Sequence, residues 1–183
     1  QMCIRDRPTT APEYVVFEGP GMDAFAESPE WGGSLVIFPF MYYETYGDDS
    51  LIKKYYQHMR RYTDYLKTRA DNGILSFGLG DWYDYGDFRA GFSRNTPVPL
   101  VATAHYYMTV MYLIKAARMV GNEFDVRYYS SLAYDIMVAF NKRFLDSNTA
   151  QYGTGSQASN ALPIFLQMIQ STGDKGDYTP DAS

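Results

Sequence analysis

One short pattern occurs twice in this chain and constrains its possible folds more than any other feature. Gly47 is followed by two acidic residues and then by Lys-Lys-Tyr-Tyr at 53–56. Gly121 is followed by Asn-Glu and then by Arg-Tyr-Tyr at 127–129, which places the two glycines 74 residues apart. Both copies join stretches whose apolar residues have helical spacing. The repeating unit is therefore predicted to be two antiparallel helices connected by a short turn.

Apolar spacing predicts five helices. The clearest covers 52–66, where apolar side chains recur at intervals of 3, 4, 3 and 4 residues. A helix over 98–120 is apolar nearly all round, which predicts burial on most sides. Pro39 is expected to kink the first helix or to confine its regularity to the second half. The first, fourth and fifth predicted helices run over 35–46, 126–144 and 156–173.

The connections between these helices alternate between short turns and long loops. Residues 8–33 are rich in proline and glycine and predict an extended loop, with a short strand at 14–17. Residues 74–97 form a second long loop, rich in glycine and aromatic residues, and 146–155 a third. In a stack of hairpins this alternation places every long loop at one end. A binding site is expected at that end.

Two of these loops contain the chain's only tryptophans, each directly after a carboxylate, as Glu30-Trp31 and Asp81-Trp82. A carboxylate accepts two hydroxyl donors, and an indole face covers the apolar side of a pyranose, so both pairs suit a sugar site. The structural alternative is that Asp81 braces its loop, that Trp82 fills the core, and that Glu30 only occupies a first helical turn. A complete acid/base pair formed by Glu30 and Asp81 is a third hypothesis, which requires a separation of roughly 6.5–9.5 Å.

Other polar residues are weaker candidates for the site. Asp84 and Asp87 lie in the same loop as Asp81 and could bind hydroxyl groups, although loop carboxylates are most often simply solvated. His105 is expected to be a core histidine whose ring nitrogens are satisfied. Gln157 and Asn160 are expected to cap a helix or brace a loop.

Composition excludes several classes of function. The net charge is −5 and the basic residues are dispersed, so nucleic acid is not expected as a partner. No stretch approaches the ~20 apolar residues that span a bilayer, so a membrane is not expected either. The two histidines and the single Cys3 have no metal-ligand spacing, and no metal or cofactor is predicted.

Three segments, in matching order and spacing, resemble the six-hairpin catalytic domain of bacterial α-L-rhamnosidases (glycoside hydrolase family 78-like). The resemblance runs from about residue 8 to the end of the chain, with Glu30 where many relatives have Asp. The first segment is Ala11–Phe17 with Ser28–Phe40 and Tyr46-Gly-Asp48, the second is Gly78-Leu-Gly-Asp-Trp82 with Thr103–Tyr107 and Ala116–Gly121, and the third is Ala139–Asp146 with Ser156–Leu162.

This resemblance implies an all-α fold, as a fragment of an (α/α)6 toroid with about two and a half hairpins. Residues 8–183 would form the partial six-hairpin domain, and residues 1–7 are expected to be a foreign or disordered segment. The implied function is part of an inverting glycoside hydrolase that releases terminal α-L-rhamnose from glycans or glycosides. Glu30, Trp31, Asp81 and Trp82 are the implied sugar contacts. The general acid and base are expected outside this chain, which alone is expected to be inactive.

Two other functions remain open from the sequence. The same toroid could act on a different carbohydrate, since a fold does not fix a substrate. A non-catalytic helical-repeat binding module is the second, although it would show a strict repeat of roughly 34–47 residues with short loops. The resemblance implies a bacterial protein. Its compartment stays open, with the periplasm or the exterior favoured over the cytoplasm.

Overall fold

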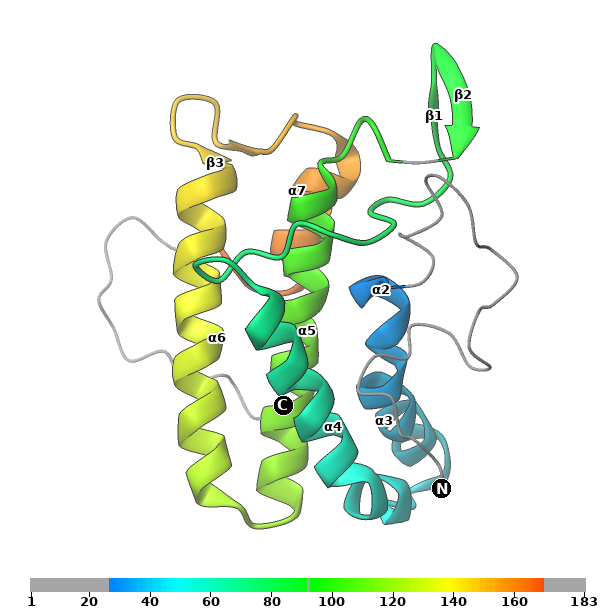
Figure 1. The fold of residues 1–183 in the computed structure, drawn as a ribbon, viewed down its shortest axis with the longest axis vertical. Coiled ribbons are helices and arrows are strands. Elements are labelled where there is room, and N and C mark those ends of the chain that lie inside the picture. The colour runs from blue at the N-terminus through cyan, green and yellow to red at the C-terminus, as the bar shows by residue number, and fades with distance from the viewer. Residues whose placement is uncertain (1–26, 92, 170–183) are drawn as a thin grey trace.

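The computed structural model describes residues 27–91 and 93–169, and nearly all of the regular structure in them is helical (Figure 1). The predicted strand at 14–17 and the segment 1–7 lie outside these residues. The helices are α2 (Pro29–Gly32), α3 (Ser34–Tyr46), α4 (Ser50–Arg69), α5 (Val98–Met119), α6 (Glu123–Phe144) and α7 (Gln157–Phe165). The strands are β1 (Asp84–Gly86), β2 (Phe88–Gly91), β3 (Leu145–Asp146) and β4 (Gln151–Tyr152).

Two helical hairpins, α3–α4 and α5–α6, form the repeat that the sequence predicts. Gly47 has a φ of 69°, a left-handed conformation that favours glycine, and its N–H donates to the carbonyl of Tyr43 at 2.7 Å. Gly121 ends α5 with a φ of 73°, and the side chain of Asn122 caps α6 by accepting the N–H of Asp125 at 3.1 Å. Both short turns lie at the lower end of the molecule in Figure 1.

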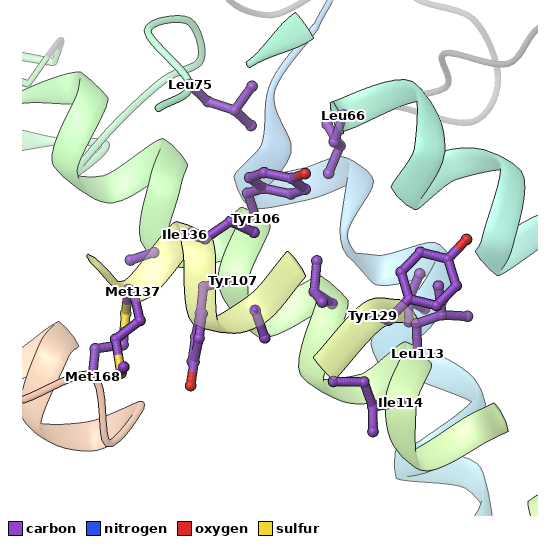
Figure 2. Close-up of a cluster of buried hydrophobic side chains, with 14 of the residues drawn as sticks. Leu66, Leu75, Tyr106, Tyr107, Leu113, Ile114, Tyr129, Ile136, Met137 and Met168 are labelled. Carbon is purple, nitrogen blue, oxygen red and sulfur yellow. The ribbon is translucent and has the colours of Figure 1, made fainter. Parts of the chain in front are cut away.

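Helix α5 is the centre of the fold. It contacts α3, α4, α6 and α7, which explains why its sequence is apolar nearly all round. Figure 2 shows Tyr106 and Tyr107 of this helix among side chains from α4 and α6, and both tyrosines are fully buried. Full burial of a large side chain contributes about 1.5–3 kcal/mol, so these residues form a substantial part of the core.

The first hairpin differs from its prediction at Pro39. Helix α3 is continuous over Ser34–Tyr46 with Pro39 inside it, so the proline does not confine the helix to its second half. The interruption lies upstream at Gly33, between α2 and α3. Pro39 is buried, so its ring packs against the core although it removes one helical hydrogen bond.

The last described helix is shorter than predicted. Helix α7 ends at Phe165 rather than at Gly173, because the chain turns at Gln167, which has a φ of 55°. The turn directs Met168 into the core, where its carbonyl accepts a hydrogen bond from Asn141 at 2.7 Å. Ile169, within the range predicted for the longer helix, lies beyond this turn and is exposed.

The connection between the two hairpins contains an antiparallel β-hairpin, β1–β2, where the sequence predicted only a loop. It projects from the upper end of the molecule in Figure 1. Among residues 27–91 and 93–169, no helix combines the length and the apolar character needed to cross a bilayer.

Candidate functional site

The long connections gather at the end of the molecule opposite the two short turns, as predicted (Figure 1). Three stretches build this loop end: residues 28–32, which include α2; residues 74–97, between α4 and α5; and residues 145–156, before α7. Hydrogen bonds connect the first stretch to the second and the second to the third. The loop end is therefore a connected layer of chain.

Glu30 lies in the first turn of α2 and binds the neighbouring loop. Its Oε1 accepts the backbone N–H of Gly80 at 3.0 Å, and its Oε2 accepts a hydrogen bond from the Ser28 hydroxyl. Both carboxylate oxygens thus have donors within the protein. The carboxylate of Glu30 does more than interact favourably with the dipole of α2, because its hydrogen bond to Gly80 joins two segments 50 residues apart.

Two glycines flank this contact, at positions with no room for a side chain. Gly78 has a φ of 129°, and a Cβ at that position would lie 2.6 Å from Glu30 Oε2. Gly80 has a φ of 67°, and a Cβ there would lie 2.8 Å from the Cβ of Ser93. Any other residue at either position would meet both an unfavourable backbone conformation and a steric clash.

Asp81 is connected to the start of α7 through hydroxyl groups. Its Oδ2 accepts a hydrogen bond from Thr96 Oγ1 at 3.2 Å, and Thr96 Oγ1 in turn lies 2.8 Å from Ser156 Oγ. Ser156 is the N-cap of α7 and accepts the N–H of Ser159 at 3.2 Å. Asp81 therefore does brace its loop, and its other carboxylate oxygen makes no hydrogen bond within the described residues.

The two tryptophans are partly accessible. Trp31 is 37% exposed and Trp82 is 39% exposed, so Trp82 does not fill the core. Both belong to the loop end that also carries Asp81. The arrangement supplies two accessible ring systems and a half-buried carboxylate, which is the chemistry that a sugar site requires.

Asp84 has a structural role that the sequence did not predict. It is buried, and its Oδ2 accepts the N–H groups of Arg94 and Asn95 at 2.8 and 2.6 Å. Its Oδ1 accepts the side-chain amide of Asn95 at 2.7 Å. Asp84 thus closes the base of the β1–β2 hairpin and is not a solvated carboxylate, whereas Asp87 is exposed, as expected.

The other polar predictions are confirmed in part. The Nδ1 of His105 lies 2.9 Å from the carbonyl of Val101, so one ring nitrogen of this half-buried histidine has a partner within its own helix. Asn160 braces the last loop by accepting the N–H of Tyr152 at 2.9 Å and donating to the carbonyl of Gly155 at 3.3 Å. Gln157 is exposed and is not the cap of α7, which is Ser156, and its side chain makes no bracing hydrogen bond with the other described residues. Within the described residues, no three His, Cys, Asp or Glu side chains are grouped to hold a metal ion.

Sequence comparison matches the chain to a family of glycosidase domains and to rhamnosidases. The family model of the bacterial alpha-L-rhamnosidase 6 hairpin glycosidase domain matches residues 6–179. An alpha-L-rhamnosidase of Formosa agariphila is 29% identical over 121 residues, which are 63% of this chain and 12% of that protein. One from Alteromonas sp. is 26% identical over 147 residues, which are 78% of this chain and 16% of that protein. The chain thus spans less than a fifth of the length of these relatives.

Solved structures agree with this assignment. The alpha-L-rhamnosidase of Dictyoglumus thermophilum has a TM-score of 0.71 and 31% identity, covering 78% of this chain and 16% of its own. The Streptomyces avermitilis enzyme, solved with L-rhamnose, has a TM-score of 0.67 and 22% identity, covering 76% of this chain and 13% of its own. These likenesses establish that the two described hairpins are arranged as in a six-hairpin glycosidase. The chain belongs to the bacterial α-L-rhamnosidase six-hairpin glycosidase family.

Proposed function

We propose that this chain is part of an inverting glycoside hydrolase that releases terminal α-L-rhamnose from glycans or glycosides. The observation that carries the proposal is the loop end, where Asp81 and the partly exposed Trp31 and Trp82 lie on stretches of chain that hydrogen bonds connect. Family membership supports the reaction class, and the relative solved with L-rhamnose supports the choice of sugar.

The proposed task of this chain is to hold the sugar rather than to break the bond. Cleavage with inversion needs one carboxylic acid to protonate the leaving oxygen and one carboxylate to activate water. Asp81 is hydrogen-bonded to Thr96 and is proposed to accept sugar hydroxyls through its remaining lone pairs. The acid and the base are proposed to lie in the rest of a longer protein, consistent with the small share of each relative that this chain covers.

Sugar binding can be measured through intrinsic fluorescence, because the only two tryptophans lie at the proposed site. We expect L-rhamnose to change the emission of the chain saturably. Asp81→Ala should raise the dissociation constant about tenfold, the effect of losing a charge-assisted hydrogen bond. Asp87→Ala is the matched control, since Asp87 is an exposed carboxylate in the same loop, and should leave the constant unchanged.

Three results would contradict the proposal. Equal responses of the Asp81 and Asp87 variants would place binding elsewhere. A stronger response to another monosaccharide would favour the same fold with a different specificity. Turnover of an aryl α-L-rhamnoside by the chain, lost on changing Glu30 or Asp81, would show that these two carboxyl groups form the catalytic pair.

A further inference from the structure

Ser28 and Glu30 form a clamp on the loop that precedes Asp81. Ser28 occupies the N-cap position of α2, yet its side chain makes no capping hydrogen bond. Its hydroxyl instead donates to Glu30 and accepts the N–H of Leu79 at 3.3 Å. Ser28 is fully buried, so its hydroxyl serves only contacts inside the protein.

The clamp binds two successive backbone N–H groups. Ser28 takes that of Leu79, and Glu30 Oε1 takes that of Gly80 at 3.0 Å. Leu79, between the two glycines, is itself buried. The residue that follows Gly80 is Asp81, so the clamp ends one peptide bond from the residue proposed to bind the sugar.

From this geometry we infer that Glu30 is a positioning residue, which fixes the backbone next to Asp81 instead of contacting the sugar itself. The inference rests on the proposed function and gives Glu30 a different role from the sugar contact that the family resemblance implies. On the other side, Thr96 holds the Asp81 side chain at 3.2 Å. The carboxylate of Asp81 is therefore fixed both through its backbone and through its own hydrogen bond.

Steric fit around the clamp supports the same role. A Cβ on Gly78 would lie 2.6 Å from Glu30 Oε2 and 2.9 Å from Pro29 Cδ. The loop thus lies against the first turn of α2 with no room for a side chain between them. The half-buried carboxylate of Glu30 thus lies directly against the loop that it binds, as expected of a residue that fixes a ligand-binding loop.

Three variants distinguish positioning from sugar contact. Glu30→Ala removes the acceptor of the Gly80 N–H, whereas Glu30→Gln keeps an acceptor oxygen and removes the charge. Ser28→Ala removes the second half of the clamp at a buried residue that cannot reach a sugar. Glu44→Ala, at an exposed carboxylate on α3, is the matched control.

The first readout is hydrogen exchange at the Gly80 amide in the 183-residue chain, followed by NMR. Glu30→Ala should accelerate this exchange about tenfold through loss of one charge-assisted hydrogen bond, and Ser28→Ala should accelerate exchange at Leu79 in the same way. Glu30→Gln should stay within about threefold of the unaltered chain, because its amide oxygen still accepts the Gly80 N–H. Glu44→Ala should change nothing.

The second and third readouts are acrylamide quenching of Trp82 in a Trp31→Phe background and the affinity for L-rhamnose with both tryptophans present. Glu30→Ala and Ser28→Ala should both increase quenching and weaken binding, and Glu30→Gln should restore both. If Glu30→Ala does not fold, Ser28→Ala and Glu30→Gln still decide between the two roles.

The inference is overturned if Glu30→Gln weakens rhamnose binding as much as Glu30→Ala does while Gly80 exchange stays protected, because that result requires direct contact through the charge. Unchanged Gly80 exchange in Glu30→Ala also overturns it. Failure of the unaltered chain to bind L-rhamnose would instead contradict the proposed function, and the amide exchange and Trp82 quenching would still test the clamp.

Discussion

The hydroxyl of Tyr62 on α4 lies against the backbone of Gly32, so that an added Cβ would stand 2.1 Å from the phenol oxygen. Gly32→Ala should therefore destabilise the chain by about 2 kcal/mol, as overpacking of a buried site does. Tyr62→Phe removes the oxygen but leaves the ring, and should recover about 1 kcal/mol of that loss. Urea unfolding of the two single variants and the double variant measures the coupling.

Gly33→Ala is the control for this cycle. Its Cβ would meet the carbonyl oxygen of Pro29 at 3.1 Å and does not approach Tyr62. Its cost should be smaller than that of Gly32→Ala and should not change in the Tyr62→Phe background. An equal cost of Gly32→Ala in both backgrounds would mean that the tyrosine hydroxyl does not limit this packing.

Two buried tyrosines should respond in opposite directions to loss of their hydroxyl groups. The hydroxyl of Tyr106 has no hydrogen-bond partner among the described residues, whereas that of Tyr129 donates to Asp64 at 2.7 Å. Tyr106→Phe should raise the free energy of unfolding by about 1 kcal/mol, and Tyr129→Phe should lower it by about 1 kcal/mol. Chemical denaturation measures both, and a destabilised Tyr106→Phe would reveal a partner for that hydroxyl.

Stability should fall at alkaline pH. Burial raises the pKa of Tyr106 above its ordinary value of 10.0, and it raises the pKa of Tyr56 and Tyr129 likewise. Above pH 10 the unfolded chain loses these protons while the folded chain keeps them, so the stabilisation is complete below the unfolded pKa and is lost as pH rises beyond it. Each such group contributes a slope of up to about 1.4 kcal/mol per pH unit.

The alkaline loss can be followed by urea midpoints between about pH 8 and pH 11. Tyr106→Phe removes one of these phenol groups. It should reduce the slope of the free energy of unfolding against pH by the contribution of that tyrosine. The exposed Tyr46 is a control, and Tyr46→Phe should leave the slope unchanged. A stability that does not vary above pH 10 would show that these phenols ionise as readily in the folded chain as in the unfolded one.

Asp84 should control the order of the β1–β2 hairpin. Asp84→Ala leaves two backbone N–H groups, those of Arg94 and Asn95, without their acceptor, at a cost of roughly 2–4 kcal/mol. Because the hairpin projects from the helices, we expect faster hydrogen exchange and protease cleavage at 84–95 with little change in helix content. Asp87→Ala serves as the exposed control, and equal protease resistance of the two variants would contradict the role of Asp84.

Exposed apolar side chains on α3 should make the chain associate with itself. Phe38 and Met41, three residues apart, are 60% and 56% exposed, which places adjacent apolar side chains on the surface of the described chain. We expect the unaltered chain to bind an apolar fluorescent dye and to associate with itself at high concentration. Phe38→Ser with Met41→Lys should reduce both, as measured by dye fluorescence and light scattering, and unchanged values would assign the effect to another surface.

Much of the helical framework could be predicted from local pattern. The stretch 52–66 lies within α4, and the glycine turns end α3 and α5, because amphipathic spacing and left-handed caps are properties of neighbouring residues. The end of α7 could not be predicted this way. It depends on Asn141, a residue of α6, which binds the carbonyl of Met168 and holds the chain in its turn.

The candidate site, like the helical framework, could be predicted only in part from local sequence. Two carboxylate and tryptophan pairs could be recognised in the sequence, and the alternation of loop lengths correctly predicted that they share one end. The contacts that hold them were missed: the local pattern predicts no role for Ser28, and it predicts an Asp84 that binds hydroxyl groups or is solvated. Their partners lie 51 and 10 to 11 residues away, at distances that no local pattern encodes.

The hydrogen-bonded contacts from Asp81 through Thr96 to Ser156 affect the order in which the loop end can form during synthesis. Thr96 and Ser156 are 60 residues apart, and the second of them begins α7. During synthesis, the first hairpin leaves the ribosome well before the serine that completes this chain of hydroxyls. A nascent polypeptide that has already formed α3 and α4 therefore still lacks the serine whose hydroxyl contacts Thr96, and the proposed sugar site gains the last of these contacts only when α7 begins to form.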